Sequence, residues 1–183
     1  IPYPTKGYAA NLLLSKKGVN ASNNLWQLNL KALGSWHLSP KTFLSATVYG
    51  GIKAPFRQPY FNKRFLGYGD VFMQGYEYYV VDGVAGGYLK TTLTREFFNF
   101  GIRMPVKGKT TDQIPVRIFG KIFSNSGYVH NPQPGENALS NQMLHSAGIG
   151  IDILTFYDVI FRLEYTFNQL GQNGLYLHRK TIF

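Results

Sequence analysis

The stretch Trp26–Ala32 reads Trp-Gln-Leu-Asn-Leu-Lys-Ala, a strict alternation of apolar and polar side chains. A period of two sends successive side chains to opposite faces of a β-strand, so this segment has one apolar and one polar face. A similar alternation returns in residues 89–97 and again in residues 159–167. The sequence therefore predicts an all-β fold whose sheet has two chemically different faces.

About eight such strands fit the chain, and we expect them to pair antiparallel in an up-and-down order. The expected strands are 7–16, 25–38, 42–52, 84–98, 115–127, 141–153, 157–168 and 174–183. The connections alternate between short and long, as they do in outer-membrane barrels. The longest connection, residues 53–83, is rich in aromatic residues and proline, which favours packing over disorder.

The alternation leaves open what the apolar face contacts. In a soluble β-sandwich that face forms the core, whereas in a transmembrane barrel it faces lipid. The chain has no run of about 20 apolar residues to form a spanning helix, but a spanning strand needs only about ten alternating residues. The 20 glycines and the aromatic content of 16% suit a barrel, because glycine lets strands bend and aromatic rings populate lipid–water interfaces.

The net charge of +10 fits nucleic acid, anionic lipid or a solvated lumen, because a basic surface acts at long range. Lysine and arginine are scattered along the chain without a recognisable nucleic-acid-binding module, so we expect no nucleic-acid partner. The chain has no cysteine, which excludes disulfides and thiolate metal sites.

The sequence lacks the residue patterns that are typical of nucleotide-binding loops, catalytic carboxylate pairs and metal-binding histidine pairs. Gly67-Tyr68-Gly69 begins like a nucleotide-binding loop, but Phe72 stands where the third glycine would be. Asp152 and Asp158 are expected to bracket a turn rather than to act as a catalytic pair. The histidines, which lack the close spacing of local metal-binding pairs, are His37, His130, His145 and His178. The sequence thus predicts a protein that is not an enzyme and that uses no metal or cofactor.

Two short segments resemble motifs of a known family. They are Phe72-Met73-Gln74-Gly75-Tyr76, in the long connection, and Phe123-Ser124-Asn125-Ser126-Gly127, in the fifth expected strand. They resemble the loop and strand motifs in the C-terminal barrel of the BamA-like outer-membrane protein assembly factors, the bacterial surface antigen superfamily. In that family the loop folds back into the barrel lumen, where its arginine meets an aspartate of the strand motif.

The resemblance assigns a role to each loop residue. Gln74 stands where the family has its arginine and Asn125 where it has its aspartate, so we expect an amide pair to replace the ion pair. Gly75 is expected where the backbone must come close to the barrel wall. Tyr76 is expected to be the aromatic plug of the lumen.

The same resemblance makes Phe123 and Gly127, on either side of Asn125, the rest of the strand that receives the loop. Glu77 is expected to partner a lumenal lysine such as Lys121.

Both ends of the chain extend the resemblance. Tyr3-Pro4-Thr5-Lys6-Gly7 is similar to the turn that precedes the ninth strand of the family's sixteen-stranded barrel. The last expected strand, which would form one side of a gate, carries Leu175 and Leu177 and ends in the aromatic Phe183. The family's preferred glycine shortly before that end is replaced by His178-Arg179-Lys180. The resemblance covers residues 1–183 as a single barrel portion, with POTRA repeats and the first barrel strands expected upstream.

The function that the resemblance implies is the insertion and folding of other outer-membrane proteins in a Gram-negative-type bacterium. A weakly paired seam between the first and last barrel strands would offer unsatisfied backbone groups to an incoming β-hairpin. The implied partners are outer-membrane lipids, unfolded outer-membrane protein clients and accessory lipoproteins. Two alternatives remain, a TamA-like translocation or two-partner secretion barrel and a soluble lipocalin-like ligand-binding barrel.

Overall fold

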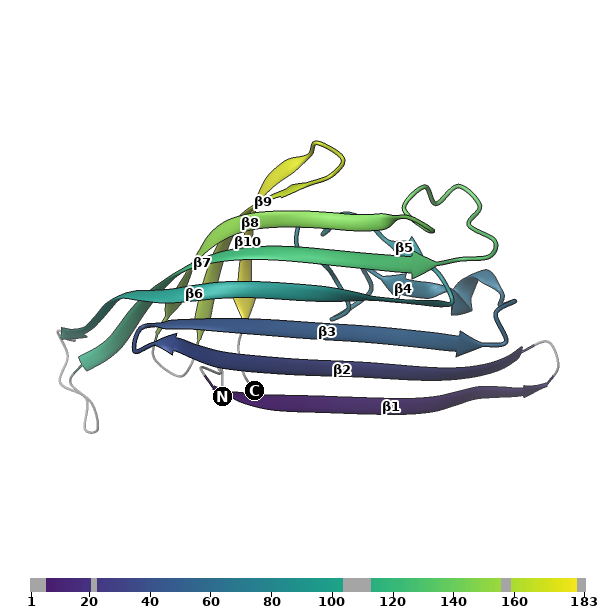
Figure 1. Ribbon diagram of the computed structural model, residues 1–183, viewed down its shortest axis with the longest axis horizontal. Coiled ribbons are helices and arrows are strands. Elements are labelled where there is room, and N and C mark those ends of the chain that lie inside the picture. The colour runs from purple at the N-terminus through teal and green to yellow at the C-terminus, as the bar shows by residue number, and fades with distance from the viewer. Residues whose placement is uncertain (1–5, 21–22, 104–112, 156–158, 181–183) are drawn as a thin grey trace.

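The computed structural model describes residues 6–20, 23–103, 113–155 and 159–180, which form one curved eight-stranded antiparallel sheet (Figure 1). Its strands are β1 (Gly7–Asn20), β2 (Asn23–Ser39), β3 (Thr42–Ala54), β6 (Ala85–Arg103), β7 (Gln113–His130), β8 (Met143–Leu154), β9 (Ile160–Asn168) and β10 (Asn173–Lys180). Their order in the sheet follows the chain, so the predicted all-β, up-and-down fold of about eight strands is confirmed. The sheet is not closed into a barrel, because β1 and β10 each pair with one neighbour only.

Several strands are longer than the alternation predicts, and the clearest case is the β6–β7 hairpin. β6 has 19 residues and β7 has 18, and the hairpin extends past its neighbours in Figure 1. The pairing register shifts between Glu96 and Phe98, as in a β-bulge. A bulge inserts one extra residue, so the side chains after it exchange their faces of the sheet. The alternation in the sequence breaks at this point, and for this reason the predicted strand ends at residue 98.

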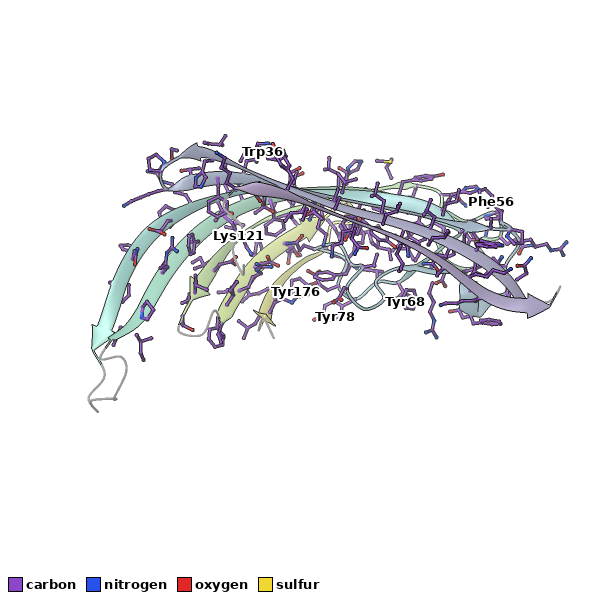
Figure 2. All side chains as sticks on the ribbon, turned by 90° about the horizontal axis from the view of Figure 1, so that it is seen from below. Trp36, Phe56, Tyr68, Tyr78, Lys121 and Tyr176 are labelled. Atoms are coloured by element: carbon purple, nitrogen blue, oxygen red, sulfur yellow. The ribbon has the colours of Figure 1, made fainter. Side chains whose placement is uncertain are left out.

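The long connection between β3 and β6 has secondary structure of its own. It contains a 3₁₀ turn, η1 (Tyr60–Asn62), and a two-stranded ribbon made of β4 (Arg64–Leu66) and β5 (Val81–Asp82). The loop lies on the concave side of the sheet, where Figure 2 shows Tyr68 and Tyr78, while Trp36 projects from the convex side. The ribbon explains how so long a connection stays compact.

The convex face is apolar and uncovered. Strand alternation puts one row of aliphatic and aromatic side chains on the face opposite the loop. Its exposed members include Leu28, Leu30, Val48, Ile52, Leu89, Leu93, Ile122, Ile149, Ile151, Phe161, Leu163, Tyr165 and Phe167. No helix in the described ranges is long and apolar enough to cross a membrane.

The hydrophobic core lies between the loop and the concave face of the sheet. Its buried residues are Tyr49, Phe65, Leu66, Met73, Tyr76, Val81, Tyr88, Val129, Leu139 and Leu144. Tyr49 and Tyr88 stack across β3 and β6 with their ring centroids 5.3 Å apart, and Phe65 of the loop meets Tyr49 edge-on. The sheet therefore buries its aromatic and polar face beneath the loop.

Candidate functional site

The candidate site has two parts. One is the docked loop, which is the segment Phe72–Glu77, and the other is the inner face of strands β7 to β10, which this loop contacts. A tight turn centres on Gly75, with the Tyr76 amide donating to the Met73 carbonyl at 3.0 Å. The carbonyl of Gly75 accepts a hydrogen bond from Asn168 Nδ2 on β9 at 2.7 Å. The loop is thus joined to the sheet through its main chain.

Gly75 is required at this turn for two separate reasons. Its φ of +87° lies in the left-handed region, which residues with a Cβ rarely adopt. A Cβ added there would lie 2.9 Å from Ser146 Cβ on β8. The close backbone approach expected of Gly75 is present, and its neighbour is β8.

Tyr76 is buried where the turn meets the sheet, with only 1% of its surface exposed. Its hydroxyl donates to the main-chain carbonyl of His145 on β8 at 3.2 Å, and its ring packs edge-on against Tyr79. Burying an aromatic ring while its hydroxyl keeps a partner avoids the cost of an unsatisfied polar group. Tyr76 therefore anchors the loop to the concave face.

Gln74 and Asn125 meet, but not through the expected amide pair. Asn125 Nδ2 donates to Ser146 Oγ at 3.1 Å and approaches the main-chain carbonyl of Gln74 at 3.5 Å. Ser146 Oγ donates to the same carbonyl. The side chain of Gln74 turns away and donates to Glu164 Oε1 at 3.3 Å. A carboxylate is a stronger acceptor than an amide oxygen, which explains the preference of the Gln74 side chain.

The other two residues of the strand motif have different surroundings. Gly127 faces the loop, since a Cβ there would lie 3.3 Å from Met73 Sδ and 3.3 Å from the Gly87 carbonyl oxygen. Phe123 is buried on the inner face of β7, where its ring covers Gly148 of β8. Asn125 and Gly127 thus lie beneath the loop motif, whereas Phe123 fills the wall beside it.

A buried ion cluster that the sequence did not reveal lies next to the docked turn. Lys121 Nζ on β7 lies 2.6 Å from Asp152 Oδ1 on β8 and 2.6 Å from Glu164 Oε1 on β9. The three side chains are between 1% and 3% exposed. Arg162 Nε adds a contact with Asp152 Oδ1 at 3.2 Å. Burying charges is tolerable only when they are paired in this way.

Gly150 makes the cluster possible. In the sheet register Lys121 pairs with Gly150, and Gly150 pairs with Glu164, so the two charged residues are separated by a position without a side chain. A Cβ at Gly150 would lie 2.8 Å from Lys121 Cε. The lysine therefore reaches across β8 to the glutamate.

The ion cluster changes two expectations. Lys121 pairs with Asp152 and Glu164 and not with Glu77. Asp152 lies inside β8 and belongs to the cluster, while Asp158, its expected partner across a turn, lies outside the described residues. The sequence did show a row of polar side chains on β9, namely Arg162, Glu164 and Thr166. Which residues of β7 and β8 lie beside that row depends on the register of the three strands.

Glu77 occupies a mostly buried position at the end of the turn. Its Oε2 accepts a hydrogen bond from the Gly75 amide at 2.7 Å. Burial raises the pKa of the Glu77 carboxyl above its ordinary value. His178 on β10 faces it, with Nε2 lying 3.9 Å from Glu77 Oε1 and 3.6 Å from Glu164 Oε2. The fold therefore gathers a histidine and two carboxylates that are far apart in sequence.

The terminal strand β10 carries Leu175 and Leu177, which were predicted to belong to one side of a gate. Leu175 and Leu177 are 66% and 72% exposed on the convex side of β10. The residues between and after them, Tyr176 and His178, face the loop instead. Phe183 and Tyr3-Pro4-Thr5 lie outside the described residues.

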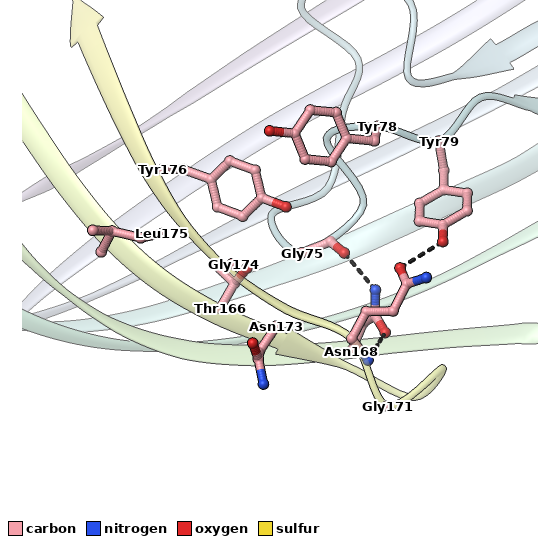
Figure 3. A pocket seen from close by; sticks show the side chains of 11 residues that line it. Gly75, Tyr78, Tyr79, Thr166, Asn168, Gly171, Asn173, Gly174, Leu175 and Tyr176 are labelled. Atoms are coloured by element: carbon pink, nitrogen blue, oxygen red, sulfur yellow. Dashed lines mark hydrogen bonds between the residues drawn. The ribbon is translucent and has the colours of Figure 1, made fainter.

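A polar cavity of about 510 Å³ opens between the loop and the β9–β10 hairpin (Figure 3). Tyr78 and Tyr176 face each other across it with ring centroids 5.6 Å apart. Tyr79 donates to Gln172 Oε1 at 2.5 Å, which joins the loop to the turn between β9 and β10. The cavity lies on the side of the site where β10 forms the edge of the sheet.

At the other end of the loop, Asp82 accepts hydrogen bonds through both its side chain and its main-chain carbonyl. Tyr68 donates to Asp82 Oδ1 at 2.9 Å, and this environment raises the pKa of Tyr68 to about 12, mainly through burial. The Asp82 carbonyl accepts from Asn131 Nδ2 at 3.0 Å and from Ser140 Oγ at 2.8 Å. Both ends of the loop are therefore fixed to the sheet or to the β7–β8 connection.

Comparisons of the chain with protein-family models, with curated proteins and with solved structures found no match. Function is therefore inferred from the docked loop and from the contrast between the two faces of the sheet.

We predict that Gly75→Ala destabilises the docked loop by more than the matched substitution Gly135→Ala. Both glycines have positive φ, which costs an alanine about 1–3 kcal/mol, but nothing lies within 4 Å of a Cβ at Gly135. The contact with Ser146 should add about 1–3 kcal/mol at Gly75. Denaturant unfolding of both variants measures the difference, and equal losses would show that the loop is not seated against β8.

A double-mutant cycle tests how Gln74 is held. The substitutions Gln74→Ala and Asn125→Ala should be additive within about 0.5 kcal/mol, because Asn125 contacts only the main chain of Gln74. Gln74→Ala and Glu164→Gln should couple by about 1 kcal/mol or more, because their side chains share a charge-assisted hydrogen bond. Free energies of unfolding give both couplings. The reverse pattern would favour the amide pair.

Proposed function

We propose that this chain is part of an outer-membrane β-barrel that assembles other outer-membrane proteins by templating their strands. One observation carries the proposal, namely a long loop docked by its Gln74-Gly75-Tyr76 turn against the polar inner face of a sheet whose outer face is apolar. The same turn carries the sequence motif that resembles the lumen-docked loop of the assembly-factor family, and this resemblance supports the proposal. The role requires neither a cofactor nor covalent chemistry.

The apolar convex face supports a lipid environment. Contiguous exposed apolar surfaces larger than a few hundred Å² are rare on soluble monomers, and they mark membrane or protein contacts. Here apolar side chains occupy the convex side of all eight strands, from Leu12 and Leu14 on β1 to Leu175 and Leu177 on β10. A lipid bilayer is the environment in which such a face is stable, and the proposed location is the outer membrane.

The orientation of the faces argues against the lipocalin-like alternative. A lipocalin turns its apolar face inward to line a ligand cavity. In this sheet the inward face carries Lys121, Asn125 and Glu164, and the loop fills the space above them. The apolar residues of this face are already packed against the loop, as the buried core shows, and are not free to line a ligand cavity.

The unpaired edge of β10 supports the strand-templating role. Its backbone N–H and C=O groups on that side have no partner strand in the described chain. Such an edge accepts an additional strand by forming main-chain hydrogen bonds. The loop meanwhile braces the adjoining wall formed by β7, β8 and β9.

The proposed partners follow from this role. They are outer-membrane lipids on the convex face, unfolded outer-membrane proteins at the open seam, and accessory lipoproteins. The second candidate, a TamA-like translocation barrel or a two-partner secretion barrel, uses the same docked loop. The two candidates differ in whether many membrane proteins or a single exported substrate depend on the chain.

We predict that Ile149→Arg destabilises the folded chain in lipid by about 2–4 kcal/mol, because the side chain would face the hydrocarbon region. Ile149 is 57% exposed, and in a soluble protein a substitution at such a surface position changes stability by about 0.5 kcal/mol or less. Asn11→Arg, on the polar side of β1, is the matched control and should be nearly neutral. The measurement is urea unfolding in phospholipid vesicles. A loss below about 1 kcal/mol at Ile149 would contradict the membrane orientation.

Depletion of the protein in its own cell tests the assembly role. We expect folded outer-membrane barrels of many kinds to decrease together, as measured by their heat-shifted mobility in gels. A matched strain that expresses Asn11→Arg should keep normal levels. If barrel levels stay constant while one secreted or surface protein disappears, the translocation or secretion role is the correct one.

A further inference from the structure

Three side chains that have a buried polar atom without a hydrogen-bond partner, Gln74, Glu77 and His178, lie close together at the docked loop. In the described residues such atoms are Ser35 Oγ, Gln74 Oε1, Glu77 Oε1, Asn125 Oδ1 and His178 Nε2. Two of these side chains, Gln74 and His178, contact the carboxylate of Glu164, and Glu77 faces His178. Each unsatisfied buried group costs about 1–3 kcal/mol, so the grouping of these three side chains makes this place a candidate ligand site.

The distances suit one metal ion. Oxygens of Glu77 and Glu164 and a ring nitrogen of His178 all lie within 4.8 Å of one another. The two distances from His178 Nε2 are 3.6 Å to Glu164 Oε2 and 3.9 Å to Glu77 Oε1. Two ligands held about 2.0–2.1 Å from a tetrahedral Zn²⁺ ion are separated by about 3.3–3.4 Å. The two distances from His178 Nε2 are therefore close to the separation that shared metal coordination requires.

The charges leave this side of the ion cluster open to a cation. Lys121 is bound to Asp152 and to Oε1 of Glu164, while Oε2 of Glu164 points toward His178. In the described part of the chain no lysine or arginine lies within ion-pair distance of Glu77. Lys90, the nearby cation, lies over the rings of Phe72 and Tyr88.

We propose that Glu77, Glu164 and His178 bind a divalent transition-metal ion of the Zn²⁺ type. Imidazole with two carboxylates is a common zinc ligand set, whereas Ca²⁺ needs six to eight oxygen ligands. Gln74 donates to Oε1 of Glu164 and so helps to orient the carboxylate whose other oxygen faces His178. The inference does not rest on the proposed assembly role.

A metal ion bound at this site would clamp the loop to strands β9 and β10. Glu77 comes from the loop, Glu164 from β9 and His178 from the terminal strand β10. One ion would therefore tie the loop to the edge of the sheet, next to the cavity lined by Tyr78 and Tyr176. Metal release would remove this tie and leave the Tyr78–Tyr176 contact and the cluster around Lys121 in place.

Metal titration of the full chain, folded in detergent and stripped with a chelator, tests the proposal. We expect one Zn²⁺ per chain with a dissociation constant in the micromolar range or below, measured by calorimetry. Co²⁺ should give the visible absorption bands of a four-coordinate site. His178→Gln and Glu77→Gln should each weaken binding at least tenfold. His145→Gln changes an exposed histidine outside the group and should leave binding unchanged.

Three results would overturn the metal site. The first is the absence of saturable Zn²⁺ binding and of Co²⁺ bands in the unsubstituted chain, a result that needs no variant to fold. The second is binding at millimolar Zn²⁺ only, which would assign the orphan atoms to water. The third is unchanged affinity in both Glu77→Gln and His178→Gln, with folding of each verified by its heat-shifted gel mobility.

Discussion

The placement of Lys121 between Asp152 and Glu164 is the interaction on which the inner wall of the sheet depends. It joins β7, β8 and β9 at one buried point, and Glu164 then receives Gln74 from the loop and faces His178 from β10. Removing one member of a buried ion pair typically costs about 3–5 kcal/mol, because the remaining charge is left without a partner. The loop thus docks onto a wall whose charges are already fixed by their partners.

Small residues set the distances at this wall. Gly150 leaves the gap through which Lys121 reaches Glu164, and Gly127 leaves room for Met73 of the loop. Gly75 brings the loop backbone against Ser146. The polar contacts therefore depend on three positions where a side chain is absent. The same wall presents apolar side chains on its other face, so a single sheet separates a polar interior from the proposed lipid.

How far the sequence predicts the fold varies along the chain. Wherever the alternation is unbroken, as in residues 26–32, it predicts the strand and its two faces. Where a bulge reverses the alternation, between Glu96 and Phe98, the predicted strand stops short because one inserted residue exchanges the two faces. The ribbon of β4 and β5 was also missed, since strands of three and two residues are too short to show a period.

The amino-acid sequence by itself determined the number and order of the strands and, where the alternation is unbroken, the face of each side chain, because these depend on local periodicity. Only the tertiary structure decided which polar groups meet. The side chain of Gln74 bonds to Glu164 instead of to the side chain of Asn125, and His178 faces Glu77, because the register of neighbouring strands sets those distances. Register is a property of strand pairs, so no single segment of sequence specifies it.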